Sequence, residues 1–478
     1  MNRIGSESAR SGRGRSTRLA VAVLATFALV AAACGGDDDD ASDGEDTATE
    51  QPEDSATEAT DDGGDDAASS EDDGAEASED AGDDAEASED AGDDAEASDD
   101  GEAAAPTGEP LKIMTVTTLN AAGPTYQNIA NTAETYEAYI NARGGVAGHP
   151  IDVTVCDEQF DPAVATTCAR QAVEEGMVSI VGSFTFFAES IVPVIAESDI
   201  TWFGACCPIT PSELTSAHSF NIGNQPMYAV GAVKRAVDDG CTNINAVIIE
   251  GAEIFVPPME NAIGALGMEF GDVISLPATA QDYSAEVAQA TGNDADCVVA
   301  VISETPYITW NTAWTQSGTE ARQYGPQGNL NSVSAAGNEE ATNGDVISGM
   351  YPDISTAPWD EYRLALEEAG LDMTELDYNS LGGLGTWAAF TGFTQIAETI
   401  EGDITAASFF EAASNTSSLD LNGMVPVLDF TQEWTAGLEG YERLFNRSVV
   451  FSTLEDGQVV PLTTEFEDVG ALATGDAG

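Results

Sequence analysis

The sequence predicts an α/β protein built on doubly wound parallel sheets, and one stretch carries the main support. Between Tyr136 and Ser183 the chain shows the end of a helical pattern, an alternating strand, a second helix and a short buried strand. A strand, a helix and a strand within about 30 residues form a right-handed crossover in a parallel sheet. Sheets of this kind are covered by helices on both faces.

Residues typical of helix starts and helix ends mark the boundaries of the elements in this stretch. Apolar residues at helical spacing run to Ile140, and Gly144–Gly145 then close the helix, because glycine adopts the left-handed conformation of a helix end. Alternating apolar residues from Ile151 to Val155 predict a strand. Asp161–Pro162 supplies an N-cap carboxylate and a proline at the first helical position, so a second helix is expected to begin there.

The second helix is expected to end at Gly176, and the apolar run Val178–Val181 predicts a strand that is buried on both faces. The phrases NARGGVAGHPIDV, DPAVATTCARQAV and IVGS in this region closely resemble the N-terminal lobe of the leucine/isoleucine/valine-binding family of extracytoplasmic solute-binding proteins. Those branched-chain amino acid-binding lipoproteins are receptors for ABC transporters. The resemblance runs from about Leu111 to about Leu462.

The resemblance implies the type 1 periplasmic binding protein fold: two doubly wound, Rossmann-like lobes joined by a three-strand hinge, which close as a clamp around a ligand. It places lobe 1 at 109–222 and 344–446, lobe 2 at 223–343 and 447–470, and a C-terminal tail at 471–478. Fold alone does not fix function.

The remaining elements follow in order along the chain. Strands are expected at 112–117, 200–203, 246–249, 273–276 and 297–302, and helices at 191–195, 228–237, 259–266 and 306–315. Val346–Met350 is expected to return to the first lobe. A long helix follows in LGGLGTWAAFTGFTQIAETI, and Arg447–Phe451 crosses between the lobes a last time.

The N-terminal segment, residues 1–33, has the pattern of a secretory signal, with five arginines followed by the apolar run Leu19–Val30. The run is shorter than the roughly 20 residues that a helix needs to span a membrane. It ends in AAAC, which resembles a lipobox with Cys34 as the lipid-bearing residue, although Ala31 replaces the commoner Leu. An ordinary signal peptide cleaved after Ala33 is the alternative.

Residues 34–108 are expected to form a disordered acidic tether. Between Gly35 and Gly108 there are 32 Asp or Glu residues and no Lys or Arg. Such a segment buries too little apolar surface to offset chain entropy. The repeat AEASEDAGDD has no apolar face that could stack, and it lacks the loop geometry of a calcium-binding repeat.

Charge excludes one class of partner. The formal net charge is −71, and the chain after the tether still carries 52 acidic against 9 basic residues, so nucleic acid is not an expected partner. The scarcity of lysine also suggests a saline habitat.

Six cysteines remain besides Cys34, and an even number in an exported chain predicts disulfide bonds. In the lobes that the resemblance implies, Cys241 and Cys297 begin two neighbouring strands, which makes them the first expected pair. Cys156 ends a strand and Cys168 lies in the helix that folds back on it, which makes the second pair. For the adjacent Cys206–Cys207 a vicinal disulfide and two free thiols both stay open.

Ligand-binding residues follow from the resemblance. The loops of lobe 1 are expected to hold a polar head group, and lobe 2 is expected to add an aromatic or polar group. No carboxylate lies between Gly325 and Gly337, where the family has a Glu for an α-ammonium, so Glu304 is expected to replace it or the ligand is not a simple α-amino acid. The candidate residues are Tyr126, Thr185, Phe186, Phe187, Ala188, Thr210, Glu304, Tyr307 and Ser332.

An enzyme is the rival class. His149 and His218 are the only two histidines, and the chain has neither an H-E-x-x-H motif nor a phosphate-binding loop with its lysine. We therefore expect no catalysis, no metal and no cofactor. The expected function is capture of a small polar ligand, an amino acid or an amide, for an ABC transporter permease by a monomeric receptor anchored to the outside of the cell membrane through its lipid. A tethered sensor with the same clamp is the alternative.

Overall fold

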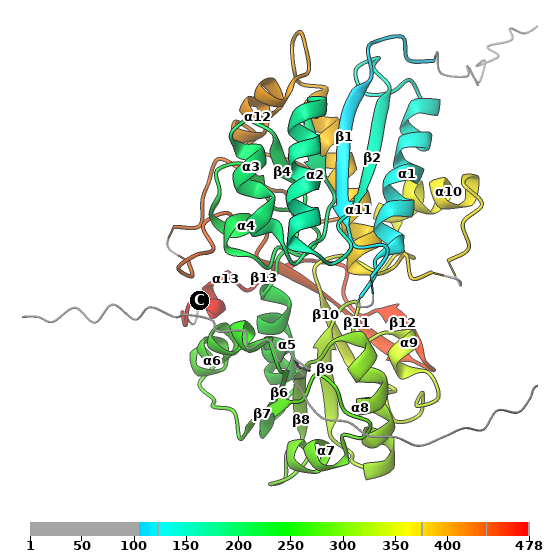
Figure 1. Ribbon diagram of the computed structural model, residues 1–478. Helices are drawn as coiled ribbons and strands as arrows, with labels where there is room; N and C mark the ends of the chain where they lie inside the picture. The colour runs from blue at the N-terminus through cyan, green and yellow to red at the C-terminus, as the bar shows by residue number, and fades with distance from the viewer. Residues whose placement is uncertain (1–104, 122–123, 374–375, 436, 477–478) are drawn as a thin grey trace, which may run out of the picture. The chain divides into compact units, whose positions relative to one another are not determined.

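The computed structural model describes residues 105–121, 124–373, 376–435 and 437–476 (Figure 1). The expected signal peptide, the lipidation residue Cys34 and the acidic segment up to residue 104 lie outside these residues. The described chain forms two sheets, each flanked by helices, as the predicted fold class requires. No helix within the described ranges has the length and apolar character needed to cross a membrane.

The first sheet has five parallel strands in the order β2-β1-β3-β4-β5. These strands are β1 (Leu111–Thr117), β2 (Ile151–Asp157), β3 (Ser179–Val181), β4 (Thr201–Phe203) and β5 (Ser219–Phe220). The connecting helices are α1 (Gln127–Ala142), α2 (Pro162–Glu175), α3 (Val192–Ala196) and α4 (Pro211–Thr215). The order places β1 in the interior, where the central residues of LKIMTVT are buried as expected of a strand covered on both faces.

Helix α2 begins and ends where local sequence predicted. The Asp161 side chain accepts a hydrogen bond from the backbone N–H of Ala163, and Pro162 occupies the first turn. Gly176 ends the helix with a φ of 69°, in the left-handed region that glycine tolerates best. The predicted strand, helix and strand around it are confirmed.

After the second sheet, the chain returns to the first sheet through the long helix α11 (Leu381–Ala397), with α10 (Asp360–Glu368) and α12 (Ala406–Ser414) beside it in sequence. The Thr386 hydroxyl donates to the Gly182 carbonyl over 2.8 Å, which joins α11 to the end of β3. Trp387, Phe390 and Ile396 are buried, as the sequence predicted.

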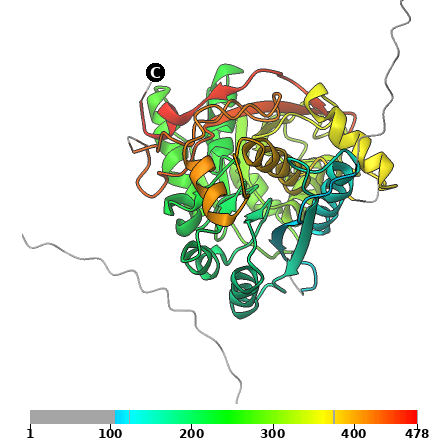
Figure 2. The same ribbon diagram turned by 90° about the horizontal axis from the view of Figure 1, so that it is seen from above.

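The second sheet follows the path β12-β11-β10-β9-β8-β6-β7, with β13 paired to β11. Strands β6 (Ile244–Ile249), β7 (Val273–Leu276), β8 (Cys297–Val301), β9 (Arg322–Pro326) and β10 (Val346–Gly349) are parallel to one another. The C-terminal part of the chain, coloured red in Figure 2, adds the antiparallel strands β11 (Ser448–Glu455), β12 (Gln458–Pro461) and β13 (Glu467–Asp468).

The position of β10 corrects one expectation. Val346–Met350 was expected to return to the first lobe, but Val346–Gly349 pair with β9 on one side and β11 on the other. The strand is short and apolar, so its sequence alone did not show which sheet it joins. The expected C-terminal tail likewise begins inside α13 (Gly470–Ala473), whose Ala473 carbonyl accepts from Asn261.

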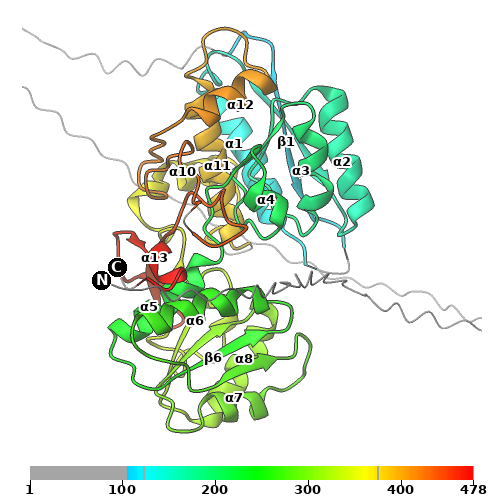
Figure 3. The ribbon, with the colours of Figure 1, turned by 90° about the vertical axis from the view of Figure 1, so that its left-hand side faces the viewer.

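Helices cover both faces of the second sheet (Figure 3). Ala246 and Ile248 of β6 pack in the cluster that contains residues of α5 (Met227–Asp238) and α6 (Val256–Ala265). Val247 between them packs with residues of α7 (Ser284–Ala290) and α8 (Glu304–Ser317). Successive strand side chains point to opposite faces, so one apolar strand serves two cores.

The segments that connect the two sheets are tied by asparagine side chains. Asn224 donates to the Ser448 carbonyl, and Asn446 donates to the Ile222 carbonyl over 3.0 Å. Both asparagines are buried, so these amides satisfy backbone groups that water does not reach. The first and last crossings are therefore joined to each other directly.

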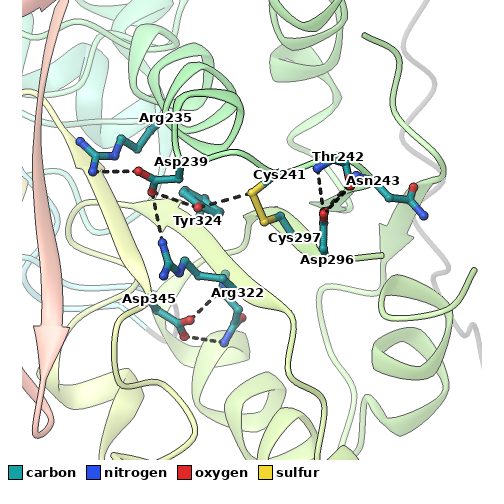
Figure 4. The surroundings of a disulfide bond; sticks show 11 residues. Arg235, Asp239, Cys241, Thr242, Asn243, Asp296, Cys297, Arg322, Tyr324 and Asp345 are labelled. Atoms are coloured by element: carbon teal, nitrogen blue, oxygen red, sulfur yellow. Dashed lines mark hydrogen bonds and ion pairs between the residues drawn. A yellow bond between two sulfur atoms is a disulfide. The ribbon is translucent and has the colours of Figure 1, made fainter. Parts of the chain in front are cut away.

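Two disulfide bonds join Cys156 to Cys168 and Cys241 to Cys297, the two pairs favoured by the sequence. The second bond links the start of β8 to the segment that leads into its neighbour β6 (Figure 4). Beside it, the Asp296 carboxylate accepts from the backbone N–H groups of Thr242 and Asn243. Cys206 and Cys207 are unpaired and buried.

Candidate ligand-binding site

A cavity of about 1040 Å³ lies where the carboxyl ends of parallel strands from both sheets meet. The loop after β1 and the first residues of α1 contribute residues 124–128, and the loop after β3 contributes Phe186. The second sheet contributes the loops that follow β6, β7, β8 and β9. This edge is where open α/β sheets bind ligands. Two smaller cavities, of about 540 and 180 Å³, share lining residues with it.

Carboxylates dominate the charge of this region. Glu250, Glu304 and Asp377 line the large cavity, and Asp353 lines the adjoining cavity of about 540 Å³. Among the described residues that line the three cavities there is no Lys, Arg or His. Clefts lined by one sign of charge focus their field, so this cavity attracts positive or strongly hydrogen-bond-donating groups.

Glu304 is the first residue of α8, and its side chain is oriented by a neighbour. Its Oε2 atom accepts a hydrogen bond of 2.6 Å from the Asn331 side-chain amide. Asn331 is itself fixed as the N-cap of α9 (Ser332–Ala335), where its side chain accepts from the Ser334 backbone N–H. One carboxylate oxygen of Glu304 is thus held by the protein, and the group keeps further acceptor capacity.

The carboxyl group of Asp377 has a raised pKa in this cavity. Burial raises its pKa to about 6, and the nearby negative charges of Glu304 and Asp353 add to the rise. The backbone N–H of Asn379 opposes it. Burial and like charge both disfavour the ionised form, so a cation placed here would relieve an unfavourable interaction.

Aromatic side chains line the large cavity and the adjoining cavity of about 180 Å³. The rings of Tyr126 and Phe184 are 4.8 Å apart, and those of Phe184 and Phe186 are 5.2 Å apart, both edge to face. On the second sheet, Tyr283 also lines the cavity and its hydroxyl donates to the Pro277 carbonyl. Aromatic faces bind apolar groups and cations, so these side chains suit a ligand with an apolar part beside a positive one.

The structure brings together three of the nine candidate residues. Tyr126, Phe186 and Glu304 line the large cavity, and Ser332 lines the adjoining one of about 540 Å³. The other five are not among the described residues that line these cavities: Thr185, Phe187, Ala188, Thr210 and Tyr307.

These five have other contacts in the described structure. The Thr185 hydroxyl donates to Glu158, and Thr210 forms a capping box with Glu213 at the start of α4. Ala188 is fully buried and starts a short 3-10 helix at Ala188–Ser190, while Phe187 packs against the Phe160 ring. Tyr307 is fully buried in the core around α8. The described structure therefore places these five residues outside the linings of the three cavities.

Sequence reasoning missed Asp377, Asp353 and Glu250. Asp377 stands in the loop before α11, and no local sequence pattern marks it as a site residue. Glu250 directly follows β6, so its position at the carboxyl end of a strand was a usable indication.

The two histidines lie elsewhere. The His149 Nδ1 atom is 2.8 Å from the Glu109 carbonyl, and His149 directly precedes Pro150 and the start of β2, at the amino end of the first sheet. His218 stacks on the Phe410 ring at 4.3 Å. Neither lines the cavities described above.

Two helix-flanked sheets with a shared cavity at the carboxyl ends of their parallel strands define a two-lobed solute-binding protein. The family model described as periplasmic binding protein matches residues 113–436, and the chain belongs to this family. The family resemblance inferred from the sequence is therefore confirmed. Proteins of this family bind solutes outside the cytoplasm. None of the curated proteins matches the chain.

Solved structures show the same fold at low identity. A branched chain amino acid ABC transporter protein from Thermus thermophilus with bound valine is 15% identical, with a TM-score of 0.61, covering 77% of this chain and 98% of that one. A substrate-binding periplasmic protein from Ralstonia solanacearum is also 15% identical, with a TM-score of 0.61 and coverage of 73% and 99%. A fatty acid ABC transporter substrate-binding protein from Thermomonospora curvata is 17% identical, with a TM-score of 0.58 and coverage of 78% and 96%.

Proposed function

We propose that the protein is an extracytoplasmic receptor that captures a small polar organic ligand carrying an amine or amide nitrogen and delivers it to an ABC importer. The observation that carries this proposal is the cavity lined by the carboxylates of Glu304 and Asp377 and by the aromatic residues Tyr126 and Phe186, with no basic residue among its described lining. The ligand's nitrogen faces the carboxylates, and its apolar part packs on the rings.

Electrostatics favour this orientation. Two ionised carboxylates in a partly closed cavity repel each other, and an ammonium group between them replaces repulsion with attraction. An amide achieves part of the same effect because its N–H groups donate to carboxylate oxygens. A ligand whose only polar group is an anion gains nothing from this wall. An amino acid would therefore place its carboxylate away from Glu304, against hydroxyl and backbone N–H groups.

The proposal extends to the whole receptor. The protein binds and releases its ligand without chemistry, as a monomer, and Cys34 carries the lipid that anchors it to the cell membrane. The ABC permease is its partner in the membrane. A tethered sensor with the same binding step is the second candidate. Neighbouring genes for a permease and an ATPase favour transport, and their absence favours sensing.

A thermal-shift screen of the purified chain tests the proposal. The panel contains hydrophobic amino acids, amides, organic amines, short carboxylates and polyols. We expect at least one amine, amino acid or amide to raise the melting temperature, because a ligand that binds only the folded state stabilises it. Stabilisation by polyols or sugars alone would show that the ligand class is wrong.

A further inference from the structure

The adjacent cysteines of the β4 loop lie in the wall of the cavity of about 180 Å³ that adjoins the large one. Both Cys206 and Cys207 line this cavity, together with Tyr126, Gln225 and Tyr228. Their sulfur atoms are 3.1 Å apart. This separation is about 1 Å longer than a disulfide bond, so the two sulfur atoms are already close to bonding distance.

The loop that carries the thiols is closely packed. A Cβ atom on Gly223 would stand 2.2 Å from the Cys206 carbonyl oxygen, and one on Gly385 of α11 would stand 2.5 Å from the Cys206 Cβ. A side chain at Gly223 or Gly385 would overlap with Cys206, so the absence of side chains at these two positions makes room for the Cys206 backbone and Cβ atom. These contacts fix the backbone and the Cβ atom of Cys206 in a closely packed position next to Cys207.

The chemical setting of the pair favours oxidation. The other four cysteines among the described residues form disulfide bonds, and the family acts outside the cytoplasm, where thiols are oxidised. We propose that Cys206 and Cys207 are a thiol–disulfide pair that is oxidised to a vicinal disulfide and forms part of the ligand-facing wall of the inner cavity. The role in ligand contact rests on the proposed function; the bond itself does not.

The reaction is a thiol–disulfide exchange in two steps. Cys207 is 7% exposed and Cys206 1%, so Cys207 attacks first and forms a mixed disulfide with an exported thiol oxidant that carries a disulfide. One thiol of the oxidant leaves. The Cys206 sulfur then attacks the Cys207 sulfur, and the second oxidant thiol leaves. Two thiols of the protein lose two electrons and two protons in total, and the oxidant disulfide becomes two thiols.

The bond is expected to be the most easily reduced of the three. Adjacent Cα atoms are about 3.8 Å apart, which is below the usual range for residues joined by a disulfide, and bonds outside that range are more reducible. The Cα atoms of the other pairs are 5.9 and 6.0 Å apart, within the range. A mild reductant is therefore expected to reduce the Cys206–Cys207 bond, in the lining of the cavity of about 180 Å³, before it reduces either of the other two disulfide bonds.

Thiol counting on the exported, full-length chain tests the proposal and needs no ligand. Protein purified without reductant is denatured in excess N-ethylmaleimide, and labels are assigned by mass spectrometry of peptides, which separates Cys34 from the count. We expect no label on the peptide that contains Cys206 and Cys207, and two labels there after mild reduction, before labels appear at the other four cysteines.

Two variants complete the test. Cys206→Ser should leave one label, at Cys207, and the neighbouring Ala205→Ser should leave none. Two labels on the unreduced wild-type peptide, persisting after incubation with oxidised glutathione, would overturn the proposal, as would a mixed disulfide or an intermolecular dimer at Cys207. Because these counts do not depend on ligand, an absence of ligand binding would count against the proposed function and leave this result standing.

Discussion

Gly204, which directly follows β4, lies against Ala389 of α11. A Cβ atom built on Gly204 would lie 2.3 Å from the Ala389 Cβ, and Gly204 has a φ of 67°. Both facts favour glycine at this position, one by space and one by backbone conformation. The absence of a side chain at Gly204 allows α11 to pack this closely against the end of β4.

Replacing Gly204 with alanine is therefore expected to be strongly destabilising. Gly370 has nearly the same φ, 68°, but open space around its Cβ position, so Gly370→Ala reports the backbone cost alone. We expect Gly370→Ala to cost about 1 kcal/mol and Gly204→Ala about 3 kcal/mol or more. Denaturant unfolding of both variants measures the difference, and equal losses would show that α11 moves to accommodate the methyl group.

The two disulfide bonds are expected to contribute unequally. Cys156 and Cys168 are 12 residues apart in sequence, and Cys241 and Cys297 are 56 apart. In the chain-entropy account the longer loop gains more, by about 1 kcal/mol for this ratio of lengths. Each pair is replaced by alanines and thermal unfolding is measured. The decrease in melting temperature should be larger for the replacement of Cys241 and Cys297. The reverse order would indicate that native contacts around the bonds outweigh loop entropy.

The raised pKa of Asp377 predicts a dependence of stability on pH. Burial and the charge of Glu304 raise this pKa to about 6 from the ordinary value of 3.8 for an aspartate side chain. Between these values the folded protein binds more protons at Asp377 than the unfolded chain does, so stability falls as pH rises through the window from about 4 to 6. The ionisation of Asp377 lowers the free energy of unfolding by at most about 3 kcal/mol.

The Asp377→Asn variant has no carboxyl group to ionise at this position and so lacks this loss of stability. The stability of the variant relative to wild type should therefore increase from pH 4 to pH 7. Burial also raises the pKa of Glu213 to about 7 and of Asp345 to about 8, and those contributions are common to both proteins and cancel in the difference. Asp152→Asn, at an exposed position on β2, is the control. If the melting temperatures of wild type and Asp377→Asn differed by the same amount at every pH, the assignment of the raised pKa to Asp377 would be refuted.

How much the sequence could predict depends on the range of the interactions involved. Helix α2 was predictable because its start at Asp161 and its end at Gly176 use neighbouring residues. The cysteine pairs could be ranked because β6 and β8 are adjacent once the fold is assumed. The partner of Thr185 could not be predicted, because its hydroxyl meets Glu158 from another loop instead of facing a ligand.

The charge of the cavity was also beyond the sequence. Glu304 was a candidate, but Asp377 and Asp353 come from the segments before α11 and after β10, and only the packed chain places them near Glu304. The same holds for β10 itself, whose four apolar or small residues fit either sheet. Local patterns predicted elements and caps, while the site is made by contacts between distant segments.

Calorimetric titration tests the central claim most directly. The best amine, amino acid or amide from the screen is titrated into wild type, Glu304→Gln and Glu320→Gln, the last being the same charge change at an exposed position beyond the end of α8. We expect saturable one-to-one binding, recovery of the ligand unchanged, a loss of about tenfold or more for Glu304→Gln and no loss for Glu320→Gln. Equal affinity for wild type and Glu304→Gln would contradict the assignment of Glu304, and a ligand recovered in altered form would contradict binding without chemistry.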